Sequence, residues 1–180
     1  MKRPEDSSRG SLRSRRRSLV LVGAAVAFAA TAAAAWALPP FTKGAKASPA
    51  GPNGPAIVYQ LSVSCGASYD RVVLRARRAT PGYRVRFVSQ ITQDASGLPV
   101  RLLGSAKLSV ALPSAQAHTF DGATAYLPAV VAPRCANLRQ VKKVGDFEGI
   151  VSLGPGLDHK AGFRVFRLTN PTRVVIDIAH

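Results

Sequence analysis

Residues 70–89 read DRVVLRARRATPGYRVRFVS. Apolar and charged side chains alternate on both sides of the central Pro81-Gly82 pair. Because successive side chains of a β-strand point to opposite faces, this alternation predicts two half-buried strands, at residues 70–77 and 83–89. A Pro-Gly pair is typical of a turn, so we expect the two strands to pair as a hairpin.

Five arginines occupy outward positions of this predicted hairpin: Arg71, Arg75, Arg77, Arg84 and Arg86. Like charges that face each other across two strands destabilise a sheet. A face this basic therefore predicts an anionic ligand, since the guanidinium fork of arginine suits carboxylate and phosphate groups. The alternative is a solvated surface that only keeps the protein soluble.

The period of two recurs along most of the remaining chain, in short segments separated by Gly and Pro residues. These segments are residues 56–63, 98–103, 106–112, 138–144, 149–153, 162–169 and 172–179. No apolar period of 3.6 residues persists after residue 40, although a helical turn is an alternative for residues 138–144. The pattern predicts a mostly β fold, a small antiparallel β-sandwich of two sheets.

Three stretches interrupt this pattern. Gly154-Pro155-Gly156 predicts the end of one strand, and Asn170-Pro171 predicts the turn between the last two strands. Residues 113–137 are rich in Pro and Ala and predict an irregular connection.

The N-terminal region has the pattern of a signal sequence. Four arginines precede an uncharged stretch at residues 19–38: Arg13, Arg15, Arg16 and Arg17. Ala35-Trp36-Ala37 then fits the small-x-small rule for cleavage, so we expect residues 1–37 to be a signal peptide and the protein to be exported. The alternative is an uncleaved signal-anchor at residues 19–38, because about 20 apolar residues also span a bilayer.

The next segment, residues 38–55, reads LPPFTKGAKASPAGPNGP. Its content of Pro, Gly, Ala and Ser predicts a disordered, flexible linker. We therefore expect the folded domain to comprise residues 56–180.

The charge balance points to an anionic partner. The 180-residue chain has 25 Lys and Arg against 9 Asp and Glu, a formal charge of +16. A chain of this length supports one compact domain and excludes a large multi-domain enzyme. In an exported protein the abundant polyanions are cell-wall glycopolymers and anionic lipids, so we do not expect nucleic acid as a partner.

The chain has two cysteines, Cys65 and Cys135. In an oxidising compartment the two thiols are expected to form a disulfide. This disulfide would close a loop of about 70 residues, and closing such a loop stabilises a fold by roughly 4 kcal/mol in the chain-entropy model. The alternative is two buried thiols.

Other polar residues give weaker signals. Asp146 and Glu148 would share one face of a strand, which could suit a metal or an acid–base pair. No His or third acid is near them in the sequence, so we expect instead a turn whose acids pair with arginines such as Arg164 or Arg173. The three histidines have no spacing typical of metal ligands: His118, His159 and His180. No Gly-x-Ser-x-Gly motif is present, so we expect no metal, no cofactor and no enzymatic activity.

Several segments together resemble a known family. They are Tyr69-Asp70-Arg71-Val72-Val73-Leu74, Pro81-Gly82-Tyr83-Arg84-Val85, residues 144–149, 156–158 and 163–166, and Pro171-Thr172-Arg173-Val174-Val175-Ile176-Asp177-Ile178-Ala179-His180. The chain resembles the AMIN-like domain of exported actinobacterial proteins and lipoproteins. It is more distantly similar to the AMIN domain that targets cell-wall amidases and secretin pilots to the envelope.

The resemblance implies a β-sandwich with a non-catalytic role, the binding of peptidoglycan or a related envelope component. The expected partner is peptidoglycan or an anionic glycopolymer, and the alternative is an envelope protein whose enzymatic activity the domain modulates. Relatives with a lipid anchor carry a cysteine at the cleavage point, which is missing here. Membrane contact is therefore expected only through an uncleaved N-terminal segment.

The motif residues also have a structural interpretation. Asp70 and Arg71 on one strand, with Arg173 and Asp177 on the last, are predicted to form cross-strand ion pairs. Such pairs fix the register of a sheet, in which a slip of one residue turns every side chain to the wrong face. We expect this role, rather than ligand contact, for the four residues.

Overall fold

The computed structural model describes residues 37–125 and 128–180. Almost all of the predicted signal segment, residues 1–37, lies outside the described residues, as does most of the alternative membrane anchor at residues 19–38. Both remain predictions. Within the described residues no helix is long and apolar enough to cross a membrane.

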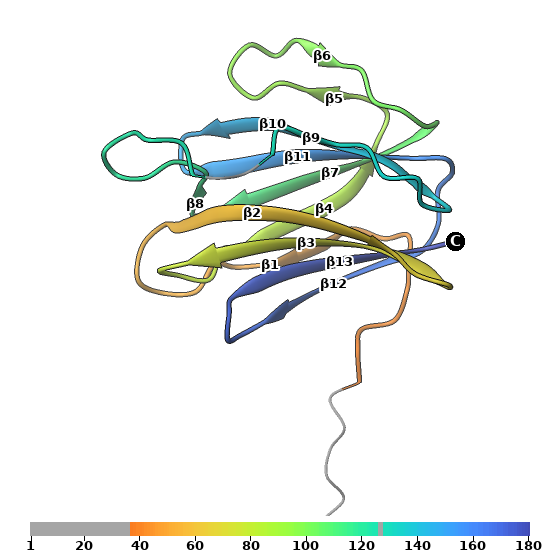
Figure 1. The fold of residues 1–180 in the computed structure, drawn as a ribbon, viewed down its shortest axis with the longest axis horizontal. Helices are drawn as coiled ribbons and strands as arrows, with labels where there is room; N and C mark the ends of the chain where they lie inside the picture. Colours follow the sequence, from red (N-terminus) through yellow and green to blue (C-terminus); the bar gives the residue numbers. More distant parts are fainter. Residues whose placement is uncertain (1–36, 126–127) are drawn as a thin grey trace, which may run out of the picture. The chain divides into compact units, whose positions relative to one another are not determined.

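Two β-sheets make up most of the domain (Figure 1). The five-stranded sheet has the order β12 (Phe163–Leu168), β13 (Arg173–Ala179), β3 (Tyr69–Arg77), β2 (Ala56–Cys65) and β8 (Ala115–Gln116). The six-stranded sheet has the order β1 (Lys46–Ser48), β4 (Tyr83–Val88), β7 (Ala106–Pro113), β11 (Ile150–Leu157), β10 (Leu138–Phe147) and β9 (Val130–Val131). Neighbouring strands are antiparallel except β2 and β8, which confirms the predicted mostly β sandwich.

Alternate side chains of both sheets form one core. The five-stranded sheet contributes Leu74 and Ile176, and the six-stranded sheet contributes Leu108 and Leu153, all almost fully buried. Burial of such a side chain stabilises a fold by about 1.5–3 kcal/mol. The core lies between the two sheets, so the opposite face of each sheet points outward.

The predicted hairpin between residues 70–77 and 83–89 is wrong. Strand β3 pairs with β2 and β13, whereas β4 pairs with β1 and β7 in the other sheet. The connection at residues 78–82 crosses between the sheets, and Gly82 lies there at a close approach of chains. Its N–H donates to the carbonyl of Pro113 (3.0 Å), and a Cβ would come within 2.9 Å of the Ala50 nitrogen.

The predicted strand end at Gly154-Pro155-Gly156 is also wrong, because these residues lie within β11. The glycines allow residues 91–105, which include the small sheet of β5 (Ile91–Thr92) and β6 (Pro99–Val100), to lie on the outer face of the six-stranded sheet. A Cβ at Gly156 would collide with the carbonyl oxygen of Leu103. The β5–β6 pair is at the top of Figure 1.

The segment predicted to be a flexible linker, residues 38–55, instead packs along the domain. Lys46 of β1 pairs with Val85 of β4, and Thr42 exchanges two backbone hydrogen bonds with Phe163 (3.2 and 3.0 Å). The Lys46 ammonium also lies 4.4 Å from the ring centroid of Phe163, and burial lowers its pKa. Composition predicted disorder, but these specific contacts give the segment an ordered place beside β12 and β4.

The predicted disulfide is confirmed. Cys65 at the end of β2 is bonded to Cys135, just before β10, with a Cα–Cα distance of 5.0 Å and a sequence separation of 70 residues. The bond therefore links the five-stranded sheet to the segment that enters the six-stranded sheet.

Candidate functional site

The five arginines of the predicted basic face lie on two different surfaces. Arg71 and Arg75 are on the outer face of the five-stranded sheet, because their neighbours Val72 and Leu74 enter the core, and Arg77 continues this alternation. Arg84 and Arg86 flank Val85, whose side chain enters the core, so the two arginines point to the outer face of the six-stranded sheet, on the opposite side of the core. Both of these arginines are exposed. A single face made from all five is therefore wrong.

The neighbouring strands supply two further arginines to the five-stranded sheet. Val174 and Ile176 of β13 and Val165 of β12 enter the core, so Arg173 and Arg164 point outward with the β3 arginines. We call this surface the arginine face and define it by five residues: Arg71, Arg75, Arg77, Arg164 and Arg173.

One end of the arginine face is neutralised by Asp177. Its carboxylate accepts hydrogen bonds from Nε (2.6 Å) and Nη2 (3.0 Å) of Arg71 and from Nε of Arg164 (2.8 Å). The Asp177 side chain is fully buried by these contacts, and its hydrogen bond and charge raise the pKa of Arg71. The predicted cross-strand ion pair is thus confirmed for Arg71 and Asp177.

Aromatic rings hold the same two arginines in place. The Arg164 guanidinium lies 4.4 Å from the ring centroid of Phe41, and that of Arg71 lies 5.2 Å from the ring centroid of Tyr69. Guanidinium groups stack favourably on aromatic faces. Arg71 and Arg164 are therefore committed to the structure of the domain.

The other end of the arginine face has no ion pair among the described residues. Arg75 lies directly opposite Arg173 in the register of β3 and β13, and Arg77 follows two residues along β3. None of the ion pairs among the described residues involves these three arginines. The Nε of Arg75 is buried without a hydrogen-bond partner there. Three guanidinium charges on this face are thus left without an ion-pair partner among the described residues.

This arrangement can bind an oxyanion. Like charges opposite each other cost about 0.2–1 kcal/mol in a sheet, and an anion between them removes that cost. Charge-assisted hydrogen bonds from guanidinium groups are about twice as strong as neutral ones. The Arg75–Arg173 end therefore offers guanidinium charge that no ion pair among the described residues neutralises.

Asp70 has a structural role with partners that the sequence did not predict. Its fully buried carboxylate accepts the backbone N–H groups of Asn137 and Leu138 (both 2.8 Å) and contacts Nε2 of His180 (3.1 Å). The predicted ion pairs of Asp70 and Arg173 are therefore wrong: Arg173 instead donates to the carbonyl oxygens of residues 169 and 171. Sequence spacing gave no signal for these backbone partners.

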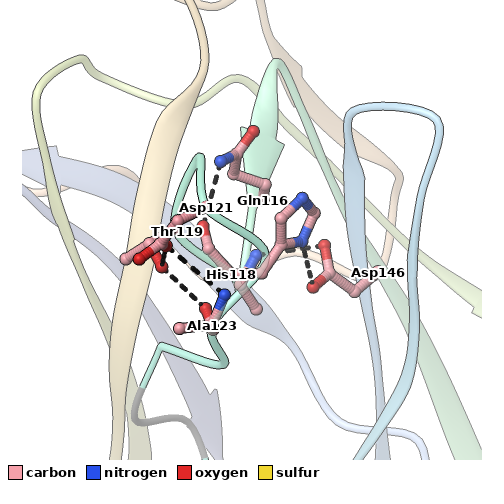
Figure 2. A network of polar contacts seen from close by, with 7 residues as sticks. Gln116, His118, Thr119, Asp121, Ala123 and Asp146 are labelled. Carbon is pink, nitrogen blue, oxygen red and sulfur yellow. Dashed lines mark hydrogen bonds and ion pairs between the residues drawn. The ribbon is translucent and has the colours of Figure 1, made fainter.

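Asp146 and Glu148 do not form a common site. Asp146 accepts the N–H of Ala117 (3.0 Å) and contacts Nδ1 of His118 (2.9 Å), as Figure 2 shows. Glu148 and Gly149 form the turn between β10 and β11, both with positive φ (49° and 73°). The predicted pairing of these acids with Arg164 or Arg173 is wrong, because both arginines have other partners.

The family assignment agrees with this geometry. The family model of the AMIN-like domain matches residues 56–180. The chain belongs to the AMIN-like domain family. No curated protein and no solved structure matches it.

Membership suggests that this AMIN-like domain is a binding module of the cell envelope rather than a catalytic domain. Together with the Cys65–Cys135 disulfide it suggests an extracytoplasmic protein, because disulfides persist in oxidising compartments. Residues 56–180 include the arginine face and Asp177, although Phe41, which covers Arg164, lies before the matched range.

In the described part of the AMIN-like domain, one group of residues has the proximity required of metal ligands: Cys65, Asp70 and Cys135. Both sulfur atoms are in the disulfide and Asp70 is occupied by its hydrogen bonds, so this group does not suit a metal. His159 contributes its backbone N–H to Asn137 (3.1 Å) and lies in a turn.

Proposed function

We propose that this AMIN-like domain is an exported, non-catalytic module that binds peptidoglycan or an anionic wall polymer through the arginine face. The observation that supports the proposal most strongly is the uncompensated set of Arg75, Arg77 and Arg173 on the outer face of the five-stranded sheet. Arg84 and Arg86, on the other outer face, are not part of the proposed site.

The physical basis of binding is electrostatic. Arg77 is exposed, and Arg75 and Arg173 are half-buried. Guanidinium groups at a surface attract a polyanion over roughly 8 Å at physiological ionic strength, and salt screens this attraction. Wall polymers carry repeated anionic groups, so several of them can reach the same face at once. Binding should therefore be strong at low salt and weak at high salt.

Co-sedimentation with purified insoluble cell wall tests the proposal. The full chain, kept in a mild non-ionic detergent because of its apolar residues 19–38, is mixed with wall at low and high salt. We expect pelleting at low salt that high salt reduces strongly. Absence of pelleting in every condition contradicts the proposal.

A second candidate is a protein-interaction module that modulates an envelope enzyme. It is favoured by the edge strand β12, of which Phe163 pairs with Thr42 while the remaining residues have no strand on their outer side among the described residues. An exposed sheet edge can accept a strand from a partner. This candidate predicts one defined protein in crosslinking pull-downs and little affinity for purified wall.

A further inference from the structure

We infer that the binding seat within the arginine face is the pair Arg75 and Arg173, with Arg77 beside it, and that its ligand is a phosphate group of an anionic wall polymer. The inference rests on the proposed function, since it names the residues and the ligand chemistry of the same face.

The Asp177 cluster shows how this sheet holds an oxyanion. Arg71 is opposite Asp177 in the β3–β13 register, and Arg164 reaches the same carboxylate from β12. That carboxylate accepts three hydrogen bonds of 2.6–3.0 Å from two arginines, and its side chain is fully buried. This internal complex is a template for the binding of an external anion.

The Arg75–Arg173 pair repeats the arrangement without the acid. Four residues from Arg71 along β3, Arg75 again faces β13, but its opposite residue is Arg173 rather than an aspartate. Directly opposed residues of neighbouring strands have Cβ atoms about 4.5–5.5 Å apart, so both guanidinium groups can reach one anion. The anion would then replace the carboxylate that this end of the face lacks.

The seat is already partly ordered. Arg173 donates to the carbonyl oxygens of Pro171 (3.2 Å) and Thr169 (3.4 Å), and the Arg77 guanidinium lies 5.7 Å from the ring centroid of Tyr59. Side chains that are held before binding lose less conformational freedom when the ligand arrives. A phosphate group that carries a single negative charge can therefore bind without a large cost in side-chain ordering.

The number of free arginines favours phosphate over carboxylate. One carboxylate saturates two arginines at Asp177, whereas the seat presents three arginines with no acid. The oxygens of a phosphate group point in tetrahedral directions, so arginines from two strands can approach it from different sides, whereas a carboxylate is planar, and a phosphate polymer repeats its charge. Arginine is common where such groups are recognised by paired N–H donors.

The test compares charge-matched variants of the full chain in the same detergent. The double substitution R75Q/R173Q removes two charges from the seat, and the control R84Q/R86Q removes two from the opposite face. Each is titrated onto wall with its phosphate polymer and onto wall from which that polymer has been stripped. Circular dichroism checks that both variants keep the fold.

We expect R75Q/R173Q to bind intact wall at least about tenfold more weakly, since one charge-assisted hydrogen bond to an anion corresponds to roughly that factor. R84Q/R86Q should bind within about threefold of the unmodified chain, which corresponds to less than 0.7 kcal/mol. R75K/R173K, which keeps the charge but loses the fork, should lie between them. Stripped wall should bind the unmodified chain no better than R75Q/R173Q binds intact wall.

Three results overturn the inference. Undiminished binding to stripped wall would mean that peptidoglycan itself is the ligand, and it leaves the proposed function standing. Equal loss in the two glutamine variants would mean diffuse attraction, and it would also contradict the arginine face as the binding site. Stronger binding to vesicles of anionic phospholipid than to wall would place the phosphate in a membrane. Failure of the unmodified chain to bind any wall contradicts the proposed function instead.

Nuclear magnetic resonance of the arginine side chains gives a second measurement that does not depend on variants. On addition of inorganic phosphate, the guanidinium N–H signals of Arg75 and Arg173 should shift, while those of Arg71 and Arg164 stay fixed by Asp177. Shifts confined to Arg84 and Arg86, or equal shifts with acetate, would overturn the assignment of the seat.

Discussion

Asp177 is the residue on which the neutralised half of the arginine face depends. Its carboxylate is fully buried and binds two arginines whose side chains are only 30% and 13% exposed. Removal of one partner from a buried charge cluster leaves the other charges without compensation. Asp177 therefore stabilises the domain by pairing with the charges of Arg71 and Arg164.

Substitution D177N should destabilise the domain. We expect a loss of about 3 kcal/mol in the free energy of unfolding, because Arg71 and Arg164 would lose their common anion inside a partly buried site. Urea unfolding followed by circular dichroism measures this. A loss below about 0.5 kcal/mol, which is the size of the effect of an ordinary surface substitution, would contradict a structural role.

Substitution R75Q, unlike D177N, should not lower the free energy of unfolding. It removes one of two like charges that face each other across β3 and β13, so stability should be unchanged or rise by about 0.2–1 kcal/mol. The same urea measurement compares it directly with D177N. Marked destabilisation by R75Q would show that the structure needs this guanidinium and would weaken its assignment to a ligand.

Acid pH should expose the contribution of Asp158. A hydrogen bond from Arg139 lowers the pKa of this exposed carboxyl below its ordinary value of 3.8. A lowered pKa in the folded state gives stability that is complete above the ordinary pKa and is lost as the pH falls through the folded pKa. The variant D158N should therefore show a flatter dependence of the melting temperature on pH below about pH 4. An unchanged profile would contradict the pairing.

Among the elements, the strand faces were predictable and the strand partners were not. The period of two in β3 and β4 correctly placed Val72 and Val85 in the core, but the alternation is the same whichever strand lies alongside. The sequence thus identified Arg71, Arg75 and Arg77 as outward residues and wrongly joined them to Arg84 and Arg86. Pairing depends on long-range contacts that a local pattern does not contain.

Motif residues and composition likewise carry no information about long-range contacts. Arg164, Arg173 and Asp177 were identifiable as motif residues, but only the register of β12, β13 and β3 shows that they share a face with Arg75. The Pro- and Gly-rich residues 38–55 predicted a linker, whereas pairing of Thr42 with Phe163 gives them a defined place. In both cases a few specific tertiary contacts outweighed the local propensity.

Substitution of Gly156 tests why β11 contains glycines within the strand. A Cβ there would collide with the carbonyl of Leu103, so G156A should displace residues 91–105 from the outer face of the six-stranded sheet. We expect destabilisation of about 1–3 kcal/mol, as for other overpacking substitutions. Faster proteolysis of that segment should accompany it. The control G44A, where a Cβ would meet nothing within 4 Å, should not increase cleavage of residues 91–105.

At the scale of the whole molecule, the disulfide connects the two sheets at one end of the core. Reduction, or substitution of Cys65 and Cys135 by Ala, should lower the free energy of unfolding by roughly 4 kcal/mol, because the closed loop restricts the unfolded chain. Urea unfolding with and without reductant measures this. Identical midpoints in the two conditions would contradict a stabilising role.

The sandwich also separates two basic surfaces that a net charge of +16 cannot distinguish. On the five-stranded sheet the charges are arranged in strand register, with one cluster neutralised and one open. On the six-stranded sheet Arg84 borders an open hollow of about 470 Å³ together with Tyr83 and Pro113, without an arginine opposite it in the strand register. Diffuse attraction treats both surfaces alike, whereas recognition by paired guanidinium groups does not.

Charge reversal on each surface therefore tests the central claim most directly. Full chains carrying R75E/R173E or R84E/R86E differ from the unmodified chain by the same four charges, and their pelleting with intact cell wall is compared at one low salt concentration. We predict that R75E/R173E no longer pellets while R84E/R86E keeps most of its binding. Equal loss in the two variants, or loss only in R84E/R86E, would contradict the arginine face as the wall-binding site.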